Sequence, residues 1–228
     1  MDSNIQKTKE YFDSKPKHFR KPLESYPILY KEAAERINKH IQGKVIDVGS
    51  AETINYDTNK IKTLILADIT NMNKEKAQKN IFLINSDMRE IGIKSDLMDF
   101  AIIQHTLHHL AGNTLKRSLK NLNQGLQESY RILKKGGKGL IIEGVVPEPF
   151  YILQKILFPI HKKIYKIFFN HPMVIQYSER QIYKELKKVG FKVEPSEIIK
   201  TDKLLGILGI NVPHWLIPIK YKFIIAVK

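Results

Sequence analysis

The chain has 228 residues and no cysteine, so its length suits one α/β domain with modest insertions, and both a disulfide framework and a thiolate metal site are excluded. Its formal charge of +15 is compatible with nucleic acid, anionic lipid or an acidic substrate as partner, and equally with a lysine-rich composition of no functional meaning. The first twenty residues are polar and lack the apolar stretch of a signal peptide, and we therefore expect a cytoplasmic protein.

The first predicted elements are two helices and a strand. Residues 4–20 are expected to be helical, and residues 27–41 place apolar side chains at helical intervals until Gly43. Residues 44–53 begin as a buried strand and break at Gly49 into a loop of small residues. Such a loop lets the backbone approach a ligand closely. Taken alone, these ten residues fit a strand-to-loop corner without a ligand equally well.

Four further apolar runs predict strands over 63–68, 81–85, 99–104 and 138–143. A short helix fits residues 74–80, and a long one fits residues 113–133, ending at the glycines 136 and 137. Ser178 and Gln181 have the spacing of a capping box, which predicts a helix up to Gly190. Residues 191–199 and 220–227 are predicted as the last strands.

The alternation of strands and helices indicates a largely parallel sheet, whose ligand would lie at the carboxyl ends of the strands. Asp47 lies in the first strand, Asp68 ends the second, and Asp87 follows the third. In open α/β sheets the position of Asp68 is where a carboxylate accepts hydrogen bonds from ribose hydroxyls. The loop after Gly49 and the acid at Asp68 together favour a nucleotide-like ligand more strongly than either does alone.

These runs resemble the class I S-adenosylmethionine (SAM) dependent methyltransferases, in particular the small-molecule "type 11" group. The resemblance covers residues 10 to about 144 and resumes at 178–200 and 220–228. It implies an α/β fold with a doubly wound, mostly parallel seven-stranded sheet and helical lid insertions, the last strand lying antiparallel between the fifth and sixth. It also implies S-adenosyl-L-methionine as cofactor and S-adenosyl-L-homocysteine as product.

By the same resemblance, a set of residues would surround SAM. Asp47, Gly49, Ser50 and Ala51 would line its methionine part, Asp68 would bind the ribose and Ile69 would pack on adenine. Asp87 would face the adenine amino group with Met88 beside it, and Gln104 would close the site. The segment 10–19 resembles the family's aromatic cover for SAM through Tyr11, Phe12 and Phe19, although an amphipathic helix packed on the sheet is an equal reading of it.

The loop after Gly49 departs from the family, because Ala51 and Thr53 stand where it has glycines. A Cβ at residue 51 resists positive φ at a cost of roughly 1 kcal/mol, so SAM binding would be weakened or the loop reshaped. The substitution Ala51→Gly is therefore expected to tighten SAM binding. This departure is the only support for a degenerate protein that binds a ligand without catalysis.

The acceptor is expected beside the histidines that follow the fourth strand. A histidine near its free pKa can take a proton from a hydroxyl or amine, and we favour His105, then His108, as that base. His109, Tyr151 and Trp215 are the predicted substrate contacts. A packing role for at least one of the histidines is the alternative, and a metal pair lacks a nearby carboxylate to complete it.

Two insertions, 145–175 and 201–219, exceed a minimal domain, and the first is predicted to hold two short apolar helices, over 150–158 and 160–169. Both leave strands at the carboxyl edge, so we expect them to roof the pocket of a single domain spanning 1–228, with residues 1–42 as N-terminal cap helices. Lysines and prolines interrupt them too often for a membrane span, but an apolar cavity that meets a membrane surface fits them. A lid that only packs on the domain fits them too.

The leading hypothesis is methyl transfer to a small, apolar or lipid-like acceptor at oxygen, nitrogen or carbon. An RNA or protein methyltransferase is the alternative, because residues 150–228 hold 14 Lys and Arg against 5 Asp and Glu. Against it, the chain has no Arg-rich patch or aromatic ladder for stacked bases. The sequence leaves the oligomeric state open.

Overall fold

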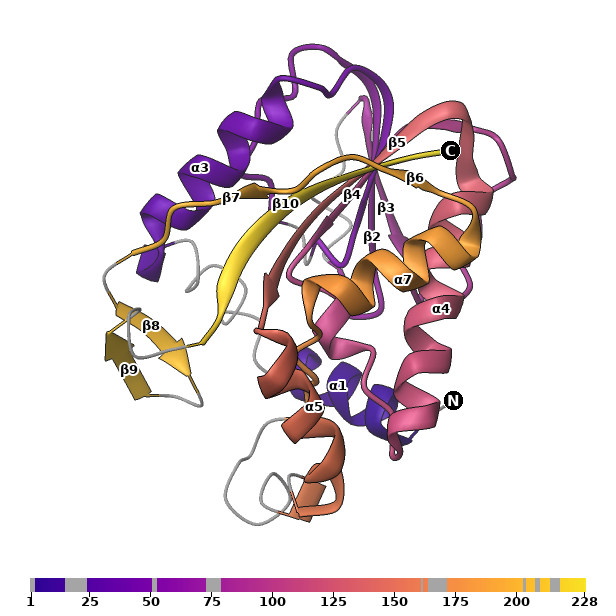
Figure 1. The fold of residues 1–228 in the computed structure, drawn as a ribbon. Coiled ribbons are helices and arrows are strands. Elements are labelled where there is room, and N and C mark those ends of the chain that lie inside the picture. Colours follow the sequence, from indigo (N-terminus) through magenta and orange to yellow (C-terminus); the bar gives the residue numbers. More distant parts are fainter. Residues whose placement is uncertain are drawn as a thin grey trace.

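The computed structural model describes residues 3–14, 24–50, 53–72, 79–160, 162–163, 172–202, 204–207, 210–213 and 218–228, and everything below concerns these residues. A central twisted sheet is covered by helices on both faces (Figure 1). The expected short helix over 74–80 and second lid helix over 160–169 lie largely outside the described residues.

The sheet has the predicted doubly wound order. Its path runs β3 (Ile81–Asn85), β2 (Ile61–Asp68), β1 (Gly43–Val48), β4 (Met98–Gln104), β5 (Leu133–Val145), β10 (Lys220–Val227) and β6 (Lys192–Val193). The five strands from β3 to β5 are parallel, and β10 runs antiparallel between β5 and β6. The strand order thus reverses between β1 and β4, which is where such sheets bind ligands.

The last edge position is shared by two short strands instead of the single strand predicted over 191–199. β6 pairs with the end of β10, and β7 (Glu197–Ile198) pairs with residues near its start. Pro195 lies between them and has no backbone N–H to donate, which interrupts the ladder. Eight strands therefore occupy the seven positions expected for the fold.

Side chains of the central strands alternate between two apolar layers. Ile46 and Val48 of β1 pack with α1 (Ser3–Asp13), α4 (Leu115–Ile132) and α7 (Glu179–Val189), whereas Val45 packs with α3 (Pro27–Asn38) on the opposite face. Figure 1 shows α3 on one side of the sheet and α4 and α7 on the other. All four residues from Val45 to Val48 are buried, as expected for a strand covered on both faces.

The boundary between α4 and β5 differs from the prediction. The helix was expected to reach residue 133 and the strand to begin at 138, but α4 ends at Ile132 and Leu133 is already extended and paired with Met98. The register between β4 and β5 shifts between Met98 and Phe100, which accommodates the extra residues. Pairing with the neighbouring strand therefore overrides the helical periodicity at this point.

The start and end of α7 follow the prediction in part. The Ser178 hydroxyl accepts a hydrogen bond from the Gln181 backbone N–H, and Gly190 ends the helix with a φ of +116°. The Gln181 side chain does not complete the capping box, because it donates to Glu185 one turn later.

The two insertions differ in structure. The first contains α5 (Glu148–Ile156), close to the helix predicted over 150–158, and the second contains an antiparallel hairpin, β8 (Leu204–Ile207) and β9 (Ile210–Pro213), instead of a helix. α1 and α5 both lie at the end of the molecule where the parallel strands have their carboxyl ends (Figure 1). Within the described ranges, no helix is long and apolar enough to span a membrane.

Candidate active site

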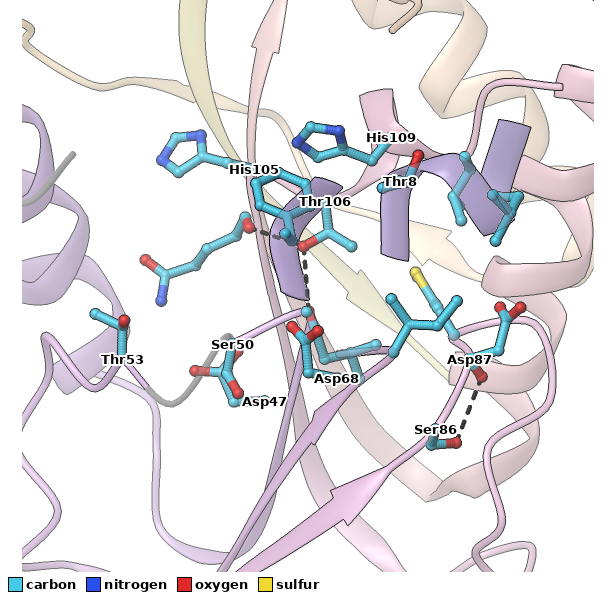
Figure 2. A pocket seen from close by; sticks show the side chains of 18 of the residues that line it. Thr8, Asp47, Ser50, Thr53, Asp68, Ser86, Asp87, His105, Thr106 and His109 are labelled. Carbon is cyan, nitrogen blue, oxygen red and sulfur yellow. Dashed lines mark hydrogen bonds between the residues drawn. The ribbon is translucent and has the colours of Figure 1, made fainter. Parts of the chain in front are cut away.

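One pocket opens at the carboxyl ends of β1 to β4 and is covered by α1 (Figure 2). Ile5, Thr8 and Phe12 face it from α1, at the spacing of one helix face. Asn4 ties the start of α1 to the carbonyl oxygens of Ala111 and Met173. Tyr11 of the predicted aromatic cover is not in the pocket lining, but the other predicted cofactor residues that the structure describes are: Phe12, Asp47, Gly49, Ser50, Asp68, Ile69, Asp87, Met88 and Gln104.

Gly49 is fixed by both its backbone conformation and its neighbour. Its φ is +77°, and a Cβ placed on it would lie 2.3 Å from the Thr106 hydroxyl. That hydroxyl in turn lies 3.2 Å from the Val48 carbonyl oxygen and 2.8 Å from that of Gln104, so it links the ends of β1 and β4. Only glycine fits here without strain, and the pocket wall is built on this contact.

Asp47 is a buried carboxylate with one oxygen still to be satisfied. The Tyr56 hydroxyl donates to its Oδ2 at 2.8 Å, while Oδ1 has no hydrogen-bond partner among the described residues. Burial raises the pKa of Asp47 to about 7, and the nearby charge of Asp68 acts in the same direction. A buried acid of this kind is stabilised by a cationic group in the pocket.

The acids of the other two strands are held by their own loops. Asp68 accepts hydrogen bonds from the backbone N–H and the hydroxyl of Thr70, at 2.9 and 2.7 Å. The Asp87 carboxylate is paired with the Arg89 guanidinium, with a shortest contact of 2.5 Å. Asp87 therefore lines the pocket as expected, but its carboxylate already has a cationic partner, which the sequence did not indicate.

His105 stands at the opposite side of the pocket from these acids, above Thr106 in the view of Figure 2. Its φ of +51° turns the chain sharply at the end of β4. Its ring makes T-shaped contacts with the rings of Tyr30 and Tyr221, with 5.5 and 5.3 Å between the ring centroids. Burial lowers the pKa of His105 to about 4, so the ring is neutral at neutral pH. Its Nε2 has no hydrogen-bond partner among the described residues.

His108 and Tyr151 lie outside the pocket lining, unlike His105 and His109. His108 Nδ1 is 2.8 Å from Oε1 of Glu143, a buried carboxylate at the end of β5 whose Oε2 accepts from the Leu107 N–H. Tyr151 is fully buried. The structure therefore gives His108 a partner that fixes the short 3-10 turn η3 (Leu107–His109), and it does not bring the Tyr151 ring to the predicted acceptor site.

Gln104 and His109 meet neighbours at the pocket wall. Gln104 and Asn55 exchange two amide hydrogen bonds, at 3.0 and 3.3 Å. The Phe12 ring contacts the His109 ring edge-on, with 5.2 Å between centroids. Three predicted residues lie outside the described ranges: Phe19, Ala51 and Trp215.

Sequence reasoning missed four residues that shape this site: Tyr30, Asn55, Tyr56 and Thr106. It also missed Glu143 as the partner of His108. An acid at the carboxyl end of a predicted central strand is a signal that was present for Glu143, since such a strand is buried and an acid there needs a partner. Tyr56 gave no comparable signal.

The described lining fits SAM in charge and in unsatisfied groups. It contains three aspartates and no lysine, arginine or glutamate. Asp47 Oδ1 and Ser50 Oγ are buried and have no hydrogen-bond partner within the part of the chain that the structure describes, and an ammonium or hydroxyl donor on a ligand would satisfy them. Ile69 and Met88 offer apolar contact for a base between Asp68 and Asp87.

Comparisons with known proteins agree with this fit. Residues 46–141 match a family model described as "Methyltransferase domain". An uncharacterized protein of Methanocaldococcus jannaschii is 25% identical over 202 residues, which cover 85% of this chain and 89% of that protein.

Two solved structures share the fold. The Haloferax volcanii protein in complex with the Trm112 methyltransferase activator has a TM-score of 0.69 at 14% identity, with 96% of each chain covered. Magnesium protoporphyrin IX methyltransferase from Synechocystis, with bound S-adenosylhomocysteine, has a TM-score of 0.64 at 13% identity and covers 99% of this chain and 100% of that one. At these identities the structures show the fold alone. The sequence match over residues 46–141, the shared fold and the lining of the pocket together support a SAM-dependent methyltransferase with SAM as its cofactor.

Proposed function

We propose that this methyltransferase acts on a small, uncharged and largely apolar or lipid-like acceptor that binds beside His105. The observation that carries the proposal is the charge of the pocket: the chain has a net charge of +15, yet the described lining contains no lysine or arginine. A phosphate or carboxylate on the acceptor would meet Asp47 and Asp68 with no cation from the described lining to offset them, since Arg89 pairs with Asp87. A neutral acceptor avoids that repulsion.

The wall around His105 supports the same conclusion. Tyr30, Asn55 and Gln104 line the pocket with it and offer aromatic surface and neutral amides. Burial raises the pKa of Tyr30 to about 12, so its hydroxyl stays protonated at neutral pH. Such a wall provides hydrogen bonds and apolar area without charge, which suits an aromatic or long-chain acceptor with one hydroxyl or amine.

When bound, SAM supplies a methyl group on a sulfonium that is already an activated leaving group, so the protein mainly has to align the acceptor and exclude water. We assign proton removal to His105. A base with a pKa of about 4 is too weak to ionise a free hydroxyl or amine. It is strong enough once the acceptor atom has begun to bond to the methyl carbon, because that atom's proton is then strongly acidic.

Around the cofactor, we assign Asp47 and Ser50 to the methionine part, Asp68 to the ribose, and Ile69 and Met88 to the adenine. The buried, unsatisfied Asp47 Oδ1 is the strongest support for its part in this set, because an ammonium group there would satisfy it. We further propose that the chain is one domain in which α1 caps SAM and the insertions at 145–175 and 201–219 roof the acceptor.

The test is methyl transfer from radiolabelled SAM into a mixture of total lipid, RNA and protein, followed by separation into organic, RNA and protein fractions. Label is expected in the organic fraction. Label confined to RNA or protein would overturn the neutral small-acceptor proposal and favour the macromolecular alternative.

Two histidine variants test the proton removal. His105→Asn is expected to lower the transfer rate by about 10²- to 10⁴-fold while leaving the calorimetric Kd for SAM nearly unchanged. His40→Asn is the matched control, because His40 lies outside the pocket lining and stacks on Phe223. An unchanged rate for His105→Asn would show that His105 only packs.

A further inference from the structure

The α5 segment presents large apolar side chains to solvent. Of the nine exposed large apolar side chains among the described residues, six lie within residues 150–160, with exposed fractions from 40% to 70%. We name these six the α5 patch: Phe150, Ile152, Leu153, Ile156, Leu157 and Ile160. Monomeric proteins seldom leave a contiguous apolar surface of this kind without a use for it.

The α5 patch is not the face with which the helix packs on the domain. That face carries Tyr151, which is fully buried, Phe158, which is 7% exposed, and Gln154, whose amide donates to the Gln176 carbonyl at 3.0 Å. The segment is therefore apolar on both sides. A helix that only packed on its own domain would carry polar residues on the outer side.

Cations accompany the α5 patch. Lys155, Lys162 and Lys163 belong to the same segment, and none of them forms an ion pair with an acid among the described residues. The Lys155 ammonium lies 4.8 Å from the centroid of the Tyr151 ring, and Lys162 donates to the Asn113 carbonyl. Lys155 thus lies on the packing side of the helix with Tyr151, whereas Lys162 and Lys163 are exposed. Apolar side chains beside exposed lysines that have no acid partner among the described residues match the interface of an anionic bilayer, where acyl chains lie beneath phosphate groups.

We propose that the α5 patch docks on a membrane surface that contains anionic lipids, with the apolar side chains at the acyl boundary and Lys162 and Lys163 among the headgroups. A second copy of the chain fits the same face poorly, because pairing two copies would bring Lys162 and Lys163 of both copies together, and Glu148 is the one acid that residues 148–163 offer against them. This inference goes beyond the proposed function, since docking does not depend on which acceptor is methylated.

The position of α5 gives docking a consequence for the reaction. α5 follows the carboxyl end of β5, at the same end of the sheet as the pocket, and it lies with α1 at that end of the molecule (Figure 1). A membrane on the α5 patch would therefore face the end of the domain where the pocket lies. An apolar acceptor could then reach the pocket from the bilayer.

The test is co-sedimentation of the full chain with phosphatidylcholine vesicles, with and without phosphatidylglycerol, at low and high salt. Binding is expected to need phosphatidylglycerol and to weaken as salt rises. Lys162→Gln together with Lys163→Gln is expected to lower vesicle affinity by about fivefold for each lysine. Leu153→Glu together with Ile156→Glu is expected to lower it by at least about tenfold.

Ile198→Glu is the matched control, because Ile198 is 59% exposed on β7, away from the α5 patch. It should bind vesicles like the unmodified chain, and calorimetry with SAM in the absence of lipid checks that every variant keeps its fold and cofactor site. The proposal is overturned if the unmodified chain binds neither vesicle, or if the Leu153/Ile156 variant binds as well. It is also overturned if light scattering finds a dimer that this variant dissociates, without vesicle binding.

Discussion

Asp47→Asn should stabilise the free protein at pH 8 while weakening its hold on SAM. The pKa of Asp47 is raised by burial from its ordinary 3.8 to about 7. The native state therefore holds this proton more tightly than the unfolded chain does. The contribution of Asp47 to the free energy of unfolding is most favourable below pH 3.8 and is lost as the pH rises to about 7. At pH 8 the ionised carboxylate therefore destabilises the fold.

The magnitude follows from the pKa values. A rise from 3.8 to about 7, at ~1.4 kcal/mol per pKa unit, costs the native state about 4 kcal/mol at pH 8. An asparagine keeps an oxygen for the Tyr56 hydroxyl, but this bond is weaker by about 1 kcal/mol than one to a carboxylate. The variant should therefore be more stable by about 3 kcal/mol at pH 8, and this advantage should shrink by about 2.5 kcal/mol at pH 5.

Urea unfolding at both pH values measures this difference, and calorimetry measures SAM binding. SAM affinity should fall by about 30-fold or more, because an amide replaces a carboxylate opposite the proposed ammonium. Glu35→Gln, which removes an exposed carboxylate on α3, is the control for charge alone. A variant that is less stable than the unmodified chain at pH 8 would refute the burial argument, and unchanged SAM affinity would refute the proposed role of Asp47.

Three further substitutions have defined outcomes. Gly49→Ala should weaken SAM binding by at least about tenfold in calorimetry, because the new Cβ strains the positive φ and clashes with Thr106. Gly92→Ala is the control and should leave SAM binding unchanged, since a Cβ there meets nothing within 4 Å. Equal effects of the two substitutions would contradict the argument. His108→Ala should lower the free energy of unfolding, measured in urea, by about 3 kcal/mol, because the buried Glu143 carboxylate would lose its His108 partner. An unchanged free energy of unfolding would mean that the other hydrogen bonds of Glu143 already satisfy it. Ala51→Gly should tighten SAM binding in calorimetry, and an unchanged Kd would show that the altered loop does not matter.

The order of the strands could be predicted from the sequence because each parallel strand is buried on both faces and so reads as an apolar run. The boundaries that failed depend on contacts between distant residues. Leu133 belongs to a helical periodicity in the sequence, and only its pairing with Met98 makes it a strand residue. The split of the 191–199 strand was within reach, since Pro195 stands in the middle of it.

The cofactor side of the site was predictable for the same topological reason. Acids at the carboxyl ends of neighbouring parallel strands must lie near one another, and Asp47, Asp68 and Asp87 do line one pocket. The acceptor side was harder. His105 and His108 differ by one helical turn in the sequence, but the left-handed φ of His105 and the 3-10 turn after it place only the first in the pocket.

The distribution of charge separates what the positive chain does from what the pocket does. If the excess of lysine served the methylated group, cations would be found beside Gly49 and His105, yet the described lining has none. Lys162 and Lys163 of the first insertion, which have no acid partner among the described residues, belong instead to the segment of the α5 patch. A pocket lined by acids without cations, beside a cationic apolar surface, indicates that the lysines place the enzyme on a membrane and that the aspartates bind SAM. Raising the salt should therefore weaken vesicle binding, while the rate on a soluble neutral acceptor should change little.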